Sequence, residues 1–154
     1  MAGAIETKMN ELGIELPAAA TPAGNYVPFV ISGNHVYISG QITARDGKIE
    51  FIGKLGSDYS VEEGQQAARI CGLNILSQLK AAVGDLDKVK RCVRLGGFVN
   101  SIPEFTDQPK VINGASDLMV EVFGDAGRHA RAAVSCPSLP LGVAVEVDAV
   151  FEIG

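Results

Sequence analysis

The stretches HARAAV (residues 129–134) and VAVEVDAV (residues 143–150) decide how this chain is expected to fold. Both are runs of small and apolar residues that carry charges where a buried strand would carry none: Arg131 in the first, and Glu146 and Asp148 in the second. If the two runs form an antiparallel hairpin centred near Leu139, Arg131 and Glu146 fall roughly opposite each other, at the spacing where cross-strand side chains interact. One strand face would then present a cation and a carboxylate together, as a wall for a small anionic ligand.

A second hairpin is predicted near the start of the chain. Two strand-like runs, residues 26–31 and 35–39, flank the short turn Ser32-Gly33-Asn34. Pro28 has no N–H to donate to a neighbouring strand, which places the first of these strands at a sheet edge or a bulge. The polar, glycine-bearing stretch that follows, as far as Gly56, is expected to be a loop with at most short strands.

Two helices and one long strand are predicted in the middle of the chain. Ser60 and Glu63 form a capping-box pattern before a helix that ends at Gly84, and apolar residues spaced by three and four positions predict a second helix over residues 110–123. Residues 89–100 read as a long strand whose adjacent glycines, Gly96 and Gly97, indicate a bulge or bend.

The resulting order is β-β-α-β-α-β-β, which predicts an α+β fold with two helices packed on one face of a mixed sheet. At 154 residues the chain is expected to be a single domain, residues 1–154, large enough to bury about 70% of the surface of its unfolded chain. Residues 1–23 form an N-terminal extension, with a short helix expected over residues 5–12. The second face of the sheet is half apolar along residues 144–150, a pattern typical of contact with another subunit.

Composition excludes several classes of function. The net charge is -5 and neither acids nor bases form blocks, so the chain offers no basic surface for nucleic acid or anionic membranes. No secretory signal or membrane-spanning run is recognisable, and a cytoplasmic location is expected. The three cysteines stand far apart in apolar runs and read as reduced core thiols, so we expect neither a disulfide framework nor a metal site.

Each candidate site residue also has a purely structural interpretation. Arginine and glutamate on a strand are most often solvated, so Arg131 and Glu146 alone do not establish a site. Tyr26 could be a half-buried strand aromatic, Ser39 and Gly40 could simply end a strand, and Asn113 could lie on a helix surface. The functional interpretation has Arg131 binding a carboxylate with its guanidinium fork and Glu146 holding a water.

The order of these residues along the chain resembles the YjgF/RidA family of reactive-intermediate deaminases, also labelled endoribonuclease L-PSP or translation inhibitor. The resemblance covers about residues 24–153. Its most specific part is the C-terminal signature, Ala130 to Val134 followed by Val145 to Val150, and the block Ile38 to Gln41 supports it independently.

The resemblance implies a chorismate-mutase-like α+β fold assembled as a homotrimer, with ligand sites in the clefts between subunits. It also implies a hydrolase that converts reactive 2-imino and enamino acids to 2-keto acids and ammonia without a cofactor. The partner would be a small-molecule carboxylate, with nucleic acid and membranes not expected.

Carried over by position, the resemblance assigns a role to each candidate residue. Arg131 matches the arginine that binds the substrate carboxylate, and Glu146 matches the glutamate that orders the attacking water. The polar cleft residues are Tyr26, Ser39, the Gly40 backbone and Asn113. Ala133 stands where many of these deaminases have a cysteine, so no mechanism that needs this thiol applies here. This substitution leaves a second hypothesis open, a non-catalytic trimer that binds keto acids, with endoribonuclease activity as a third.

Overall fold

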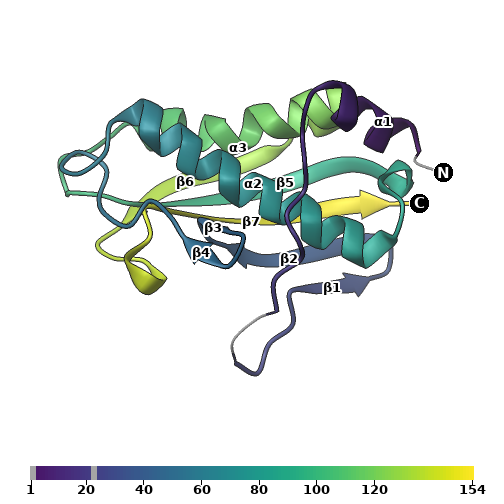
Figure 1. Cartoon of the computed structure of the whole chain (residues 1–154), viewed down its shortest axis with the longest axis horizontal. Coiled ribbons are helices and arrows are strands. Elements are labelled where there is room, and N and C mark those ends of the chain that lie inside the picture. The colour runs from purple at the N-terminus through teal and green to yellow at the C-terminus, as the bar shows by residue number, and fades with distance from the viewer. Residues whose placement is uncertain (1–2, 22–23) are drawn as a thin grey trace.

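The computed structural model describes residues 3–21 and 24–154, and it forms one five-stranded sheet covered on one face by two long helices (Figure 1). The helices are α1 (Ala4–Glu11), α2 (Val61–Val83) and α3 (Gln108–Phe123), and the strands of the large sheet are β1 (Phe29–Ser32), β2 (His35–Gln41), β5 (Val89–Asn100), β6 (Ala130–Cys136) and β7 (Val145–Ile153). A small second sheet pairs β3 (Ala44–Arg45) with β4 (Lys48–Ile49). Short 3-10 turns, η1 (Leu86–Lys88), η2 (Gly124–Gly127) and η3 (Pro140–Gly142), precede β5, β6 and β7. The predicted α+β class, with α2 and α3 on one face of a mixed sheet, is confirmed.

Local sequence signals set the ends of the two long helices. Before α2, the Ser60 hydroxyl accepts a hydrogen bond from the Glu63 backbone N–H at 3.2 Å, and the Glu63 carboxylate accepts one from the Ser60 N–H at 3.0 Å. This reciprocal cap is the predicted capping box, and it satisfies N–H groups that have no partner inside the helix. Gly84 and Gly124 follow α2 and α3 with positive φ angles of 80° and 63°, a conformation that favours glycine and ends a helix.

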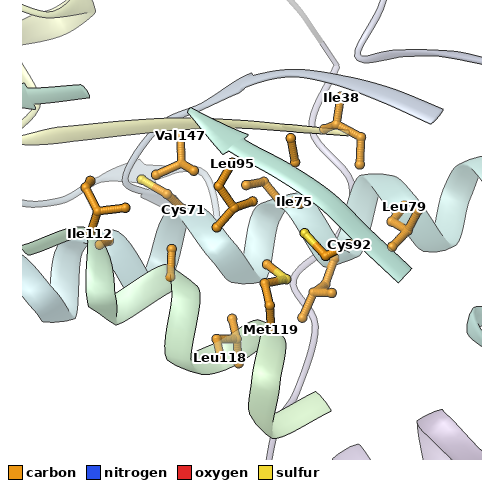
Figure 2. Packing of buried hydrophobic residues seen from close by; sticks show 14 of the residues in the cluster. Ile38, Cys71, Ile75, Leu79, Cys92, Leu95, Ile112, Leu118, Met119 and Val147 are labelled. Carbon is orange, nitrogen blue, oxygen red and sulfur yellow. The ribbon is translucent and has the colours of Figure 1, made fainter. Parts of the chain in front are cut away.

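The hydrophobic core fills the space between the helices and the sheet. In Figure 2, Cys71 and Ile75 from α2 and Leu118 and Met119 from α3 pack with strand residues such as Val147, and all of these side chains are buried. All three cysteine thiols are free, and Cys71 and Cys92 are buried in the core as predicted, whereas Cys136 at the end of β6 is only partly buried and lies outside the core. Burial raises the pKa of Cys92 to about 12, so this thiol stays protonated and packs as a small apolar group.

The sheet order, β1-β2-β7-β5-β6, overturns the expected terminal hairpin. β6 pairs in parallel with β5, while β7 pairs antiparallel with the opposite edge of β5 and with β2. The chain passes from β5 through α3 to β6, and such a strand-helix-strand crossover makes its two strands parallel. The segment after β6, which contains η3, then carries the chain past the end of β5 instead of folding back on β6.

The adjacent glycines of β5 do not mark a bulge, which corrects a second expectation. The register with β7 shifts between Val89 and Arg91 and between Cys92 and Arg94, whereas Gly96 and Gly97 continue the regular pairing. A Cβ at Gly97 would overlap the side chain of Ile112 on α3. The missing side chain therefore lets α3 lie close to the sheet.

The two long helices also approach each other closely, at Gly114 of α3. A Cβ on Gly114 would overlap the backbone carbonyl of Gln65 in α2, which cannot move away as a flexible side chain could. Gly114→Ala is therefore expected to lower the free energy of unfolding by about 1–3 kcal/mol, the usual cost of overpacking, measured by urea denaturation. Asp117→Ala, an exposed change on the same helix, is the control and should change it by less than about 0.5 kcal/mol. Equal midpoints for Gly114→Ala and wild type would contradict this view of the helix contact.

The described part of the N-terminal extension is packed against the rest of the chain. α1 matches the predicted short helix, and its first N–H groups, at Ala4 and Ile5, donate to the Asp87 carboxylate at 2.9 Å each. Met9 and Ile14 are buried in the core. Residues 1–2 and 22–23 of the predicted extension lie outside the described residues.

Candidate functional site

The Arg131 guanidinium of the candidate site donates hydrogen bonds to three acceptors from α3. Nη1 donates to the Asn113 side-chain oxygen at 2.8 Å and to the Ser116 hydroxyl at 3.0 Å, and Nη2 donates to the Pro109 carbonyl at 3.1 Å. The side chain is half-buried. A guanidinium has five N–H donors, so two have no acceptor among the residues that the structure describes. Two donors are the number that a carboxylate engages in a forked contact.

The helix residues that hold Arg131 come from one face of α3. Asn113 and Ser116 are three positions apart, the spacing that brings side chains together on a helix. Asn113 is a predicted site residue, whereas Ser116 and the Pro109 carbonyl are not. The sequence shows Ser116 only as a polar residue on the helix. Its contact with Arg131 of β6 in the folded structure is what marks it as part of the site.

Glu146 lies on β7 beside Gly40, at the end of β2. A Cβ on Gly40 would overlap the Glu146 carboxylate, so the close approach depends on glycine lacking a side chain. Partial burial raises the pKa of Glu146, and the nearby Asp148 carboxylate raises it further. The group is thus a carboxyl that holds a proton to higher pH than an exposed glutamate.

A cavity of about 450 Å³ opens beside Glu146. Its lining includes Thr21, Tyr26, Gly40, Gln41, Leu141 and Glu146. The predicted site residues Tyr26, Gly40 and Glu146 therefore gather at one cavity. The N-terminal extension contributes to its wall through Thr21.

Ser39 has a supporting position beside this cavity. Its hydroxyl donates to the Val27 carbonyl at 2.7 Å, and its backbone N–H donates to the Pro28 carbonyl at 2.9 Å. These two bonds fasten the segment that follows Tyr26 to β2. Ser39 is not among the residues that line the cavity.

The predicted residues fall into two groups on opposite faces of the sheet, which corrects the expected Arg131–Glu146 pair. Arg131 is in register with Leu95 of β5, and Glu146 is in register with Phe98. Because side chains alternate along a strand, Arg131 shares the helix-covered face of the buried Leu95, whereas Glu146 points to the other face. β5 separates the two strands.

Ala133 belongs to the Arg131 group. It pairs with Gly97 two positions after Arg131, and it is half-buried against the core. It therefore does not lie between Arg131 and Glu146, as the hairpin would have placed it. Among residues 3–21 and 24–154, no cluster of three or more histidine, cysteine or acidic side chains could hold a metal ion. The described helices also include none with the length and apolarity to cross a membrane.

The raised carboxyl pKa predicts a pH dependence of stability. A carboxyl whose pKa is higher in the folded state stabilises the fold fully below its unfolded-state pKa, and this contribution is lost as pH rises through the folded-state pKa. Wild type should therefore lose more unfolding free energy than Glu146→Gln between pH 4 and 7, because the amide cannot ionise. Urea denaturation of both proteins across this range measures the difference. Parallel curves for the two proteins would contradict the raised pKa.

Comparisons of sequence and structure with known proteins identify the family. Residues 6–152 match the family described as "YjgF/chorismate mutase-like, putative endoribonuclease". Protein TCP17 of Trypanosoma cruzi is 53% identical over 152 residues, which cover 98% of this chain and 95% of that protein. The crystal structure of Atu1372, a protein of unknown function from Agrobacterium tumefaciens, is 52% identical with a TM-score of 0.89 and covers 97% of this chain and 93% of its own. A "putative endoribonuclease" from Shewanella oneidensis is 40% identical with a TM-score of 0.94, and the match covers 98% of this chain and 100% of that one. These matches confirm the predicted resemblance, and the chain belongs to the YjgF/chorismate mutase-like family.

Proposed function

We propose that this chain is a hydrolytic deaminase of 2-imino and enamino acids, which it converts to 2-keto acids and ammonia. The observation that carries the proposal is the Arg131 guanidinium, which three internal acceptors fix while two N–H donors stay uncommitted among the described residues. Such a group suits the carboxylate that every 2-imino acid carries. The resemblance to reactive-intermediate deaminases at Arg131 and Glu146 supports the same reaction class.

The proposed site combines two copies of the chain. Arg131 and Glu146 lie on opposite faces of the sheet with β5 between their strands, so one small substrate cannot contact both within one chain. In a homotrimer, the Arg131 group of one copy can face the Glu146 cavity of the next. The apolar side chains on the open sheet face, including the exposed Val30, Tyr37 and Val134, favour such an assembly.

The proposed chemistry follows from these two groups. Arg131 fixes the carboxylate, so that the imine carbon lies beside a water held by Glu146. The water oxygen bonds to this carbon, the C=N π pair moves to nitrogen, and Glu146 relays one water proton to the nitrogen. Glu146 then relays the hydroxyl proton as well, the C–N bond breaks with its electron pair on nitrogen, and ammonia leaves as the C=O bond forms.

The environment of Glu146 supports its role in this relay. Partial burial and Asp148 raise its pKa, which brings the carboxyl closer to the pH at which a group both accepts and returns protons effectively. Because imines already hydrolyse in water, positioning of the substrate and the water supplies most of the acceleration. No cofactor takes part in the proposed reaction.

Ala133 favours a second candidate function, a keto-acid-binding assembly without turnover. The position is two residues after Arg131 on the same strand face and carries no reactive atom. In that case the carboxylate contact at Arg131 would remain and the water relay would not operate. The endoribonuclease description of the family has less support in this chain, because a net charge of -5 disfavours the approach of RNA.

A coupled assay separates these candidates. A threonine dehydratase generates the unstable 2-imino acid in place, and the rates of 2-oxobutyrate and ammonia release are measured with and without this protein. We expect acceleration by wild type, and loss of acceleration in Glu146→Gln with retained binding of 2-oxobutyrate. Binding of 2-oxobutyrate by wild type without any acceleration would favour the binding assembly, and absence of both would contradict the proposed function.

A further inference from the structure

A chain of three hydrogen bonds extends from Arg131 away from the uncommitted donors. Arg131 Nη1 donates to the Ser116 hydroxyl at 3.0 Å, the Ser116 oxygen lies 2.8 Å from His129 Nε2, and His129 Nδ1 lies 2.6 Å from the Gly127 carbonyl oxygen. Ser116 comes from α3, whereas His129 immediately precedes β6. Neither residue belongs to the set that the sequence pattern identified.

The acceptors in this series of hydrogen bonds fix the direction of each bond. A carbonyl oxygen can only accept, so His129 Nδ1 carries the proton that bonds to Gly127. With Nδ1 protonated, the neutral ring has Nε2 as an acceptor, and the Ser116 hydroxyl donates to it. The Ser116 oxygen is thereby left to accept from Arg131, and all three bonds run in the same direction.

The position of His129 depends on the close packing of the preceding turn, η2, against α3. A Cβ on Gly127 would overlap the Met119 carbonyl of α3, so the turn η2 lies directly against this helix. His129 is half-buried beside it. The imidazole is therefore fixed relative to the same helix that presents Asn113 and Ser116 to Arg131.

The charges of the neighbourhood favour a neutral imidazole. Desolvation lowers the pKa of His129, and the Arg131 guanidinium lowers it further, while the Gly127 carbonyl opposes them. A protonated ring would also donate to Ser116, so that two cations would donate to one hydroxyl oxygen. The neutral form removes this conflict.

We propose that Ser116 and His129 are positioning residues for Arg131, which hold its guanidinium plane so that the two remaining N–H donors meet the substrate carboxylate. This inference deepens the proposed function and rests on it. Asn113 and Pro109 hold the guanidinium at two further points, so loss of Ser116 or His129 loosens the group without removing its charge. The expected signature is weaker carboxylate binding with little change in the chemical step.

The first test compares binding and turnover. Ser116→Ala and His129→Phe should each raise the KM for the imino acid and the Kd for 2-oxobutyrate about 10-fold, the upper end of what one ordinary hydrogen bond contributes, with kcat within about threefold of wild type. Ser116→Thr keeps the hydroxyl and should restore both constants. His35→Phe, at the other histidine of the chain, should leave them unchanged. A kcat that collapses in Ser116→Ala at constant KM would overturn the proposal, because it would make the hydroxyl a reacting group.

The second test does not depend on catalysis. Nitrogen NMR of the two histidines, assigned with His35→Gln, should give a neutral His129 ring protonated on Nδ1 at pH 7. The Arg131 guanidinium, followed through its side-chain N–H signals, should rotate slowly in wild type and Ser116→Thr, and faster in Ser116→Ala. A ring protonated on Nε2, or unchanged Arg131 rotation in Ser116→Ala, would overturn the positioning role. If wild type binds no keto acid but shows the expected His129 tautomer and Arg131 rotation, the proposed function fails, whereas the hydrogen bonds that hold Arg131 through Ser116 and His129 are confirmed.

Discussion

Arg131→Ala is expected to lower kcat/KM for 2-imino acids by roughly 30- to 5,000-fold, the range for truncating one partner of a hydrogen-bonded charge pair. The substrate carboxylate would lose both N–H donors of the forked contact, and the imine carbon would no longer be held beside the water. Both KM and kcat should suffer, because the same contact binds and orients the substrate. The dehydratase-coupled release of 2-oxobutyrate measures the effect against the rate without added protein.

Two further arginine variants make this result specific. Arg128→Ala removes an exposed charge three residues before Arg131, at a side chain paired only with Asp125 among the described residues, and should keep the wild-type rate. Arg131→Lys keeps the charge but not the planar fork, so it cannot serve three internal acceptors and a carboxylate together. We expect it to remain well below wild type. Equal rates for Arg131→Ala and wild type would remove the basis of the proposed site.

Mixing two inactive variants is expected to restore activity, which is the second large effect. If each site takes Arg131 from one copy and Glu146 from the next, an equal mixture of Arg131→Ala and Glu146→Gln subunits contains intact sites. Random assembly of a cyclic trimer would make about one quarter of the sites intact. The mixture should therefore recover about 25% of the wild-type rate after co-refolding, whereas each variant alone stays near the background.

The control for mixing is the double variant, which carries both changes in one chain. When it is co-refolded with wild type, a site is intact only where two wild-type subunits are neighbours, because the double variant supplies neither Arg131 nor Glu146. Two variants refolded separately and combined afterwards give the rate without exchange. If co-refolding of the single variants restores nothing although the subunits have exchanged, the two residues do not act in one site.

The elements predicted best are those that local chemistry determines. α2 begins after Ser60 and ends before Gly84 because its cap and its stop lie within the helix's own neighbourhood in sequence. β5 spans residues 89–100 as predicted. The Gly33 turn likewise joins β1 to β2 in an antiparallel pair.

Strand pairing could not be predicted in the same way. Arg131 and Glu146 lie on consecutive strands, and consecutive strands often pair, but β5 has two free edges and takes both β6 and β7. The choice depends on how α3 packs and on where the chain crosses the sheet, which are long-range effects. The predicted hairpin of consecutive strands therefore placed Arg131 opposite Glu146, whereas in the observed sheet β5 separates their two strands.

The site itself was predicted in part. Resemblance identified residues that the structure gathers at two places, Asn113 with Arg131 and Tyr26 with Gly40 and Glu146. The sequence does not identify Ser116 and His129 as site residues, because serine on a helix and an isolated histidine have no distinctive local pattern. Their contact with each other spans 13 residues and needs the turn at Gly127 to form.

The central place of β7 also bears on how the protein is made. Translation proceeds from the N-terminus, so β7 emerges from the ribosome after the strands on both sides of it, β2 and β5. Until then the β1–β2 hairpin and the β5-α3-β6 unit have no strand to join them, and each leaves a sheet edge unpaired. Completion of the sheet must therefore follow synthesis of residues 145–153, and until then the nascent chain exposes two unpaired strand edges, the kind of edge at which strands pair wrongly.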